Sequence, residues 1–237
     1  MVFQYILCVL FGYVIGGINP SYIIGRLRGI DIRKKGSGNA GASNAMILMG
    51  KKVGIFSAVF DIAKGAAAFL CAPLIFRQIA YASVIAGTAC IIGHICPAYM
   101  KFRGGKGLAC IAGIVIGIDW RFFLILLATE VALALIADYI CVIPMTAAFI
   151  VPLCYGFLGS DGLGWLLHAD GGWIGAAILA VASVAILLRH IQNIKRIIAG
   201  KEVHLSYLWT KDKDAEIARV SGAKNEESEQ EEPGTHT

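Results

Sequence analysis

Residues 173–188 have the sequence Trp-Ile-Gly-Ala-Ala-Ile-Leu-Ala-Val-Ala-Ser-Val-Ala-Ile-Leu-Leu, which contains no charged side chain. A helix needs roughly 20 mostly apolar residues to cross the hydrocarbon core of a bilayer, or about 17–25 when it tilts. Similar apolar blocks occupy residues 66–76, 81–95, 108–118 and 122–137. Several reach spanning length only with flanking Gly, Ser and Thr, which let membrane helices pack closely. The pattern predicts an all-α integral membrane protein.

The composition excludes an ordinary soluble domain. Of the 237 residues, 57% are apolar and 16% are charged, against about 45–50% and about 25% in soluble domains. No basic stretch precedes the apolar N-terminus, which disfavours a cleaved signal peptide. The net charge of +5 arises from basic residues in particular loops and does not indicate nucleic-acid binding. We expect no cofactor.

The cysteines lie in or beside apolar blocks and form no CxxC pair. They are Cys8, Cys71, Cys90, Cys96, Cys110, Cys141 and Cys154. This placement is typical of buried, reduced thiols rather than of a disulfide or a metal site. We therefore expect no metal.

We predict seven spans, at about residues 3–25, 53–76, 79–99, 107–118, 122–138, 140–158 and 173–189. The fourth is short enough to be a half-buried helix, so a five-span arrangement remains the alternative. Residues 1–202 form one polytopic membrane domain. Residues 203–237 form a cytoplasmic polar tail, and its acidic end is expected to be disordered.

The loops differ in positive charge, and this difference predicts the orientation. Lys and Arg are frequent in residues 26–52, 101–106 and 189–201, whereas the intervening connections hold few. Cytoplasmic loops carry the excess of Lys and Arg. Seven spans then place the N-terminus outside and the C-terminus in the cytoplasm of a bacterial inner membrane. Trp120, Trp165 and Trp173 fall near the outer span ends, as an aromatic belt requires.

Three polar segments fall on the same predicted cytoplasmic face. Segment one is Gly36-Ser37-Gly38-Asn39-Ala40-Gly41-Ala42-Ser43-Asn44. Segment two covers residues 93–107 and ends in Gly104-Gly105-Lys106-Gly107. Segment three covers residues 190–202 and includes His190, Asn193, Arg196 and Glu202.

Glycine-rich loops that lead into helices can aim backbone amides at an anion. Lys106 has the chemistry of a phosphate-binding lysine, but the Walker A spacing is absent. Each feature has a plainer explanation, because such loops are often simple turns and such lysines often only set topology. Asp61 and Lys64, three positions apart within an apolar span, are either a self-contained ion pair or a functional pair.

The three segments resemble the motifs of the bacterial acyl-phosphate-dependent glycerol-3-phosphate acyltransferases. In that family the first motif is roughly GSGNPGATN with an Arg three residues later, the second GHxxPxFxxFxGGKGVA, and the third HxxNIxRLxxGxE. This chain matches the second at Gly93, His94, Pro97 and the 104–109 stretch, and the third at His190, Asn193, Ile194, Arg196, Gly200 and Glu202.

Segment one departs from the family pattern at three positions. Ala40 replaces Pro, Ser43 replaces Thr and keeps the hydroxyl, and Ile47 replaces Arg. The last change removes a charged, bidentate phosphate contact. Lys51, one helical turn beyond Ile47 if the helix continues, and Lys52 are candidate substitutes.

The resemblance implies transfer of a fatty acyl group from acyl phosphate to sn-glycerol 3-phosphate, giving 1-acylglycerol 3-phosphate and phosphate. The substrates and the lipid bilayer are then the partners, together with a functional link to an acyl-phosphate-forming enzyme. Expected catalytic residues are Ser37, Lys106, His190 and Asn193. Expected substrate-binding residues are Gly36, Gly38, Asn39, Gly41, Ser43, Asn44, Gly104, Gly105, Gly107, Arg196 and Glu202.

The general base remains open between His190 and the donor's own phosphate, and we favour the phosphate. No His is followed by Asp in a His-x4-Asp pair, and no membrane helix carries a spaced aspartate cluster. Acyltransferases of the soluble type and phosphatidyl-transferring enzymes are therefore disfavoured. An anion transporter is the non-enzyme alternative, and it predicts broken helices with binding groups near the bilayer midplane.

Overall fold

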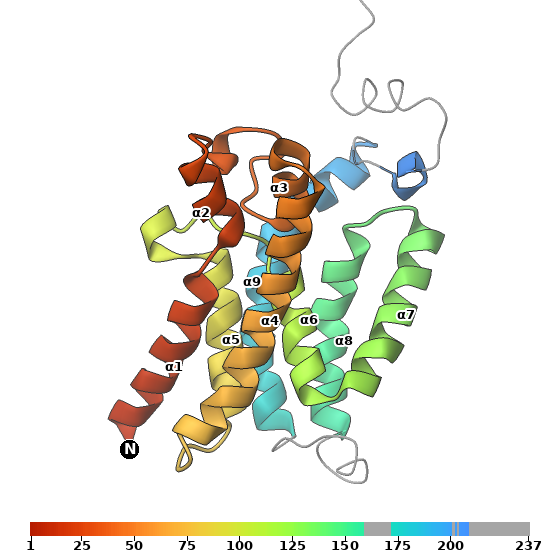
Figure 1. The fold of residues 1–237 in the computed structure, drawn as a ribbon. Coiled ribbons are helices and arrows are strands. Elements are labelled where there is room, and N and C mark those ends of the chain that lie inside the picture. The colour runs from red at the N-terminus through yellow and green to blue at the C-terminus, as the bar shows by residue number, and fades with distance from the viewer. Residues whose placement is uncertain (159–171, 201, 203, 209–237) are drawn as a thin grey trace, which may run out of the picture.

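A computed structural model describes residues 1–158, 172–200, 202 and 204–208. Within these residues the regular structure is entirely helical, which confirms the predicted all-α class (Figure 1). The α-helices are α1 (Val2–Gly17), α2 (Pro20–Leu27), α3 (Ala42–Met49), α4 (Lys51–Ile75), α5 (Ala82–Ile95), α6 (Leu108–Ile118), α7 (Trp120–Ala137), α8 (Val142–Leu158) and α9 (Trp173–Ile198). The short 3-10 helices are η1 (Ile32–Lys34), η2 (Ala98–Met100) and η3 (Leu205–Leu208).

Every predicted apolar segment is helical, but their lengths differ from the prediction. Among the described residues, four helices are long and apolar enough to cross a bilayer alone: α4, α5 together with η2, α7 and α9. The α1–α2 pair would be a fifth. The predicted fourth and sixth spans correspond to α6 and α8, which are apolar but shorter.

The first predicted span, residues 3–25, is not one straight helix. It is broken between α1 and α2, which meet at 47°. Asn19 begins α2 because its side chain accepts a hydrogen bond from the Tyr22 amide at 2.9 Å, and Pro20 suits the first helical position. The same Asn19 amide group donates to the Ala40 carbonyl at 2.9 Å. The two hydrogen bonds of Asn19 therefore connect the α1–α2 break to segment one.

Helices α1 and α5 pack closely through glycines. A Cβ atom on Gly16 would lie 1.9 Å from the Cys90 carbonyl oxygen, and one on Gly93 would lie 2.2 Å from the Tyr13 carbonyl oxygen. Helices α4 and α6 pack in the same manner at Gly65 and Gly113. Small residues give membrane helices their van der Waals contact, since lipid tails are as apolar as the side chains.

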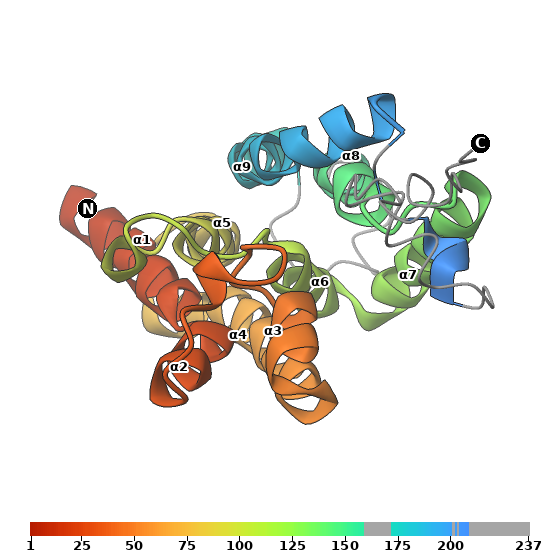
Figure 2. The same ribbon diagram turned by 90° about the horizontal axis from the view of Figure 1, so that it is seen from above.

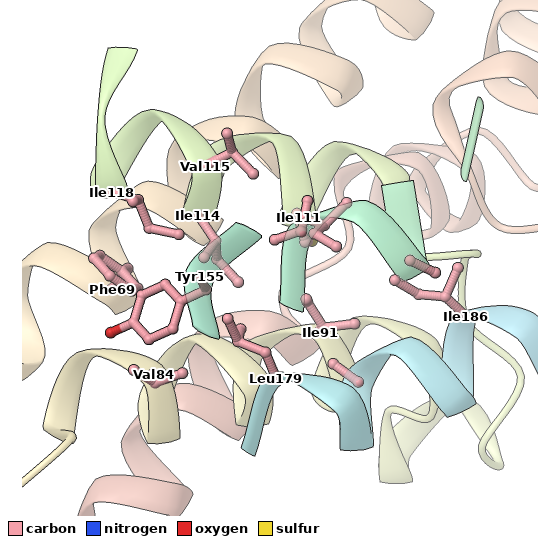
Figure 3. Packing of buried hydrophobic residues seen from close by; sticks show 14 of the residues in the cluster. Phe69, Val84, Ile91, Ile111, Ile114, Val115, Ile118, Tyr155, Leu179 and Ile186 are labelled. Atoms are coloured by element: carbon pink, nitrogen blue, oxygen red, sulfur yellow. The ribbon is translucent and has the colours of Figure 1, made fainter. Parts of the chain in front are cut away.

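A central apolar core joins these pairs to α8 and α9. Ile91, Ile114, Tyr155, Leu179 and Ile186 interdigitate there, with side chains from α5, α6, α8 and α9 (Figure 3). Two smaller clusters lie under α1 and around α3. The core fixes the position of α6 and α9, whose ends carry segments two and three.

The polar segments gather at one end of the bundle. Figures 1 and 2 show α2, α3, the connection into α6 and the C-terminal part of α9 at that end. The N-terminus and the first residues of α7 and α9 lie at the opposite end, where Trp120 and Trp173 are both more than half exposed. Asp161, Trp165, Asp170 and the polar tail beyond residue 208 lie outside the described residues.

The α1–α5 contact yields a matched test of close packing. Gly16→Ala should destabilise the protein by about 1–3 kcal/mol, the usual cost of overpacking, because the new methyl group meets backbone that cannot move independently. Gly17→Ala is the control, since nothing lies within 4 Å of a Cβ atom there. Thermal unfolding in detergent measures both, and equal melting temperatures for the two variants would contradict this close packing.

Candidate active site

Segment two folds back onto the C-terminal end of α5. The Gly104 amide donates to the Ile95 carbonyl, and the Gly105 amide donates to the His94 carbonyl, each at 3.0 Å. These bonds satisfy carbonyls that a helix end otherwise leaves without partners. A Cβ atom on Gly105 would lie 2.1 Å from Nε2 of His94. Only glycine at this position lets the loop lie against the imidazole, and the loop in turn fixes where Lys106 begins.

Lys106 is the first link of a hydrogen-bonded chain. Its Nζ donates to Oδ1 of Asn193 at 2.7 Å, and Nδ2 of Asn193 donates to Oε1 of Glu202 at 2.9 Å. Lysine can only donate and an ionised carboxylate can only accept. The two neighbours therefore fix which way the Asn193 amide faces. Segments two and three meet here, as the sequence predicts.

The ammonium of Lys106 is set among other charges. Burial lowers its pKa, the nearby Glu202 carboxylate opposes this, and the positive charges of Arg196 and Arg189 lower it further. Asn193 takes one of the three N–H donors of Lys106. The remaining donors and the surrounding positive charge make this a suitable site for an anion.

His190 lies one helical turn before Asn193 on α9, and both side chains are buried. Its Nδ1 is 2.8 Å from the Ile186 carbonyl oxygen. A carbonyl only accepts, so Nδ1 carries the proton and Nε2 of the neutral ring is an acceptor. His190 can therefore receive a hydrogen bond from a substrate hydroxyl.

Segment one is a loop wrapped around one buried side chain. Asn44 donates to the carbonyls of Ile32, Lys35 and Asn39 at 2.9–3.0 Å and accepts from the Ser37 amide at 3.0 Å. The sequence predicts Asn44 as a substrate-binding residue, but the structure buries it completely and uses its amide to shape the loop. Gly36 has a φ of +59°, and a Cβ atom there would lie 2.2 Å from Oδ1 of Asn44.

The other residues of segment one have mixed surroundings. Ser37 and Ser43 are exposed, and Asn39 is half-buried. Oδ1 of Asn39 has no hydrogen-bond partner among the described residues although it is inaccessible to solvent. No hydrogen bond between described residues joins these three side chains to Lys106 or Asn193. Within the described residues, segment one thus shares the end of the bundle with the other two without a hydrogen bond from these side chains to Lys106 or Asn193.

Two arginines connect the segments through the backbone of segment two. Nη1 of Arg33 donates to the Met100 carbonyl at 2.6 Å while its other nitrogens pair with Asp31. Nη2 of Arg189 donates to the Gly104 carbonyl at 3.2 Å. In the sequence both arginines belong to the basic stretches that predict the orientation, and no motif gives them another role. Their carbonyl contacts depend on tertiary structure and leave no pattern in the sequence.

Two local predictions need correction. Segment three is not a loop after residue 189, because α9 continues to Ile198 and carries His190, Asn193 and the exposed Arg196. Lys51 does not follow Ile47 on one helix, because α3 ends at Met49 and Gly50, with a φ of +92°, separates it from α4. The sequence spacing therefore does not place Lys51 beside Ile47.

Asp61 and Lys64 form a buried ion pair with a third partner. Nζ of Lys64 is 2.7 Å from Oδ1 of Asp61 and 3.0 Å from Nδ1 of His94, and it donates to the Ile18 carbonyl at 2.6 Å. Ile18 lies at the α1–α2 break, so Lys64 satisfies a carbonyl that the break exposes.

Asp61, His94 and Cys110 have ligand atoms within 4.8 Å of one another, a grouping that could hold a metal ion. The ammonium of Lys64 already supplies a cation to two of these residues. The transporter alternative predicts a broken helix with binding groups at the break. Here the carbonyl at the break already accepts a hydrogen bond from the side chain of Lys64.

Known proteins resemble this arrangement over most of its length. The family model described as glycerol-3-phosphate acyltransferase matches residues 6–200. The chain belongs to this family. A glycerol-3-phosphate acyltransferase of Brucella melitensis biotype 2 is 34% identical over 195 residues, covering 82% of this chain and 90% of that protein. Glycerol-3-phosphate acyltransferase 1 of Oceanobacillus iheyensis is 35% identical over 216 residues, covering 87% and 98%.

Two crystal structures share the fold. Both are of PlsY, an integral membrane glycerol 3-phosphate acyltransferase. Its glycerol 3-phosphate form superposes with a TM-score of 0.73 at 29% identity, covering 86% of this chain and 97% of that one. Its lysophosphatidic acid form gives a TM-score of 0.68 at 28% identity, covering 84% and 94%. This family member is therefore an acyltransferase and a multi-pass membrane protein.

Proposed function

We propose that this chain transfers a fatty acyl group from an acyl phosphate to sn-glycerol 3-phosphate, releasing lysophosphatidic acid and inorganic phosphate. The observation that carries the proposal is the chain of contacts from Lys106 through Asn193 to Glu202 at the polar end of an apolar bundle. One substrate carries a fatty chain and the other is soluble and anionic. A site at the membrane surface can hold both.

The groups around the site suit a glycerol phosphate. The Lys106 ammonium and the Lys106 and Gly107 amides bind phosphate, since the Gly104 and Gly105 amides already donate to α5 carbonyls, and Arg196 adds positive charge. Asn39 in segment one holds a buried oxygen without a partner among the described residues, and a glycerol hydroxyl is a donor that fits it. Ser37 and Ser43 supply further hydrogen bonds, while Asn44 keeps the loop in shape.

For the chemical step we infer direct transfer without an acyl-enzyme. An acyl phosphate is already activated, so a protein nucleophile is unnecessary. Asn193 or the backbone amides of Lys106 and Gly107 stabilise the oxyanion of the tetrahedral intermediate. Nε2 of His190 orients the attacking hydroxyl, and the donor's phosphate takes the proton as it leaves. An acyl-phosphate-forming enzyme must supply the donor.

The purified protein should consume acyl phosphate and glycerol 3-phosphate together and release phosphate. Acyl-CoA and acyl-carrier protein should not replace the donor, because the chain has no His-x4-Asp pair to activate the acceptor hydroxyl. Palmitoyl phosphate and palmitoyl-CoA, tested side by side with labelled glycerol 3-phosphate, provide the measurement. Comparable turnover with the thioester would refute the donor assignment.

Lys106→Ala should lower kcat/KM by roughly 10- to 100-fold. A hydrogen bond to a charged group contributes about 1.5–3 kcal/mol, and each 1.36 kcal/mol changes a rate tenfold. Lys106→Arg should restore little of this activity, because a planar guanidinium group does not fit a position shaped for a compact ammonium. Since burial lowers the pKa of Lys106, activity should also decline at a lower alkaline pH than an ordinary lysine would give.

Lys34→Ala is the control for this test, because Lys34 is an exposed lysine at the same end of the bundle. It should leave phosphate release unchanged. Size-exclusion in detergent verifies that each variant is folded. A folded Lys106→Ala protein with wild-type rates would show that Lys106 only sets topology.

We also infer that the polar end faces the cytoplasm of a bacterial inner membrane, because Lys and Arg concentrate there. Cysteines introduced one at a time at Lys34 and Asp161, in a background with the exposed Cys71 replaced by Ser, report the orientation. Lys34→Cys should react with an impermeant maleimide only after the cells are opened, and Asp161→Cys should react in intact spheroplasts. The reverse result would overturn the orientation.

A further inference from the structure

The turn between α7 and α8 holds a second polar cluster, centred on Asp138. This residue ends α7 with a φ of +59° and belongs to none of the three segments. Its backbone carbonyl accepts from the Leu205 amide at 2.7 Å. Its Oδ1 accepts from the Ser206 amide at 2.6 Å, and its Oδ2 accepts from the Ser206 hydroxyl at 2.8 Å.

His204 completes the cluster. Its Nδ1 lies 2.9 Å from Oδ2 of Asp138, and its ring stacks on Tyr139 with 4.8 Å between centroids. Residues 204–206 are therefore docked on a turn that lies more than 60 positions earlier in the sequence. We call these contacts the Asp138 clasp. Burial works against the charged form of Asp138, but the hydrogen bonds from Ser206 and His204 outweigh it and lower the carboxyl pKa.

The clasp is adjacent to the proposed anion site. Glu202, which accepts from Asn193, is only two positions before His204. Cys141, three positions after Asp138 in the α7–α8 turn, is buried. The charges of the Glu202 carboxylate and the Lys106 ammonium both act on its thiol. Burial and the charge of Glu202 raise the pKa of the Cys141 thiol to about 11. The α7–α8 turn and the segment after α9 thus meet beside Lys106.

We propose that Asp138 is a positioning residue for the acyl transfer: it anchors residues 204–206 so that Glu202 stays on Asn193 and the Asn193 oxygen stays on Lys106. The inference rests on the proposed function. Without the clasp, residues 204–206 have fewer fixed contacts, and Glu202 spends less time on Asn193. The amide of Asn193 is then free to rotate, and Lys106 loses the acceptor that aims its ammonium.

The size of the effect follows from the exposure of the clasp. Asp138 and His204 keep 36% and 33% of their side-chain surface accessible, so solvent weakens the pair. Asp138→Ala should lower kcat/KM for glycerol 3-phosphate by roughly 2- to 30-fold, the range for residues that act through others. Asp138→Asn should retain more activity than Asp138→Ala, because its carbonyl oxygen can still accept from the Ser206 amide.

A double-mutant cycle separates positioning from general stability. On a Glu202→Ala background, Asp138→Ala should cause no further loss of kcat/KM, because the residue through which it acts is gone. Asp119→Ala is the matched control. Asp119 is the residue that caps the start of α7, at the opposite end of that helix from Asp138, and it pairs with Arg121. The Asp119→Ala substitution should lower the melting temperature without changing kcat/KM. Independent, multiplying losses from Asp138→Ala and Glu202→Ala would overturn the proposal.

Hydrogen exchange tests the anchor without any reference to activity. The peptide that contains Ser206 should exchange faster in Asp138→Ala than in the wild type and should be unchanged in Asp119→Ala. Unchanged exchange in Asp138→Ala refutes the clasp even if the protein proves to use other substrates. Inactive wild-type protein with faster exchange in Asp138→Ala would overturn the proposed function and, with it, the catalytic role of the clasp.

Discussion

A backbone carbonyl inside a bilayer must find its hydrogen-bond donor within the protein, because no water is available to supply one. The α1–α2 break places this demand at Ile18, and Lys64 meets it with a donor from α4. Lys64 then needs its own counter-charge, which Asp61 provides one turn earlier on the same helix. His94 joins the pair from α5, and the Gly105 backbone rests on that imidazole. The break, the ion pair and the loop that carries Lys106 are therefore linked.

Segment two is the centre of the polar end, and its backbone is held from both sides. Arg33 approaches its backbone from the side of segment one, at Met100, and Arg189 approaches from the side of segment three, at Gly104. Both arginines donate to carbonyl oxygens and so hold the loop whatever side chains it carries. Lys106 is the side chain through which segment two donates a hydrogen bond to Asn193.

The sequence predicts the features that depend on composition and order: the all-α membrane fold, the apolar helices and the three polar segments at one end. The break at Ile18 does have a signal in the sequence, Asn19 followed by Pro20, but the length of the apolar run does not register it. The sequence assigns Asn44 to ligand binding, since nothing in a string of polar residues says which side chain turns inward. The role of Asp138 is equally hidden, because its partners lie 66–68 positions away. How far segment one takes part in the site also depends on tertiary contacts that spacing does not encode.

The distance along the chain between Lys106 and Asn193, 87 positions, has a consequence for biosynthesis. Ribosomes add about 5–20 residues per second, so the lysine is synthesised on the order of ten seconds before its hydrogen-bond partner exists. During that interval the growing chain has a positively charged loop but no amide to aim it and no Glu202 to hold the amide. A nascent chain that stalls before α9 therefore lacks the contact on which the proposed anion site depends. The hydrogen-bonded chain from Lys106 through Asn193 to Glu202 can form only after α9 has been made and has packed against the bundle.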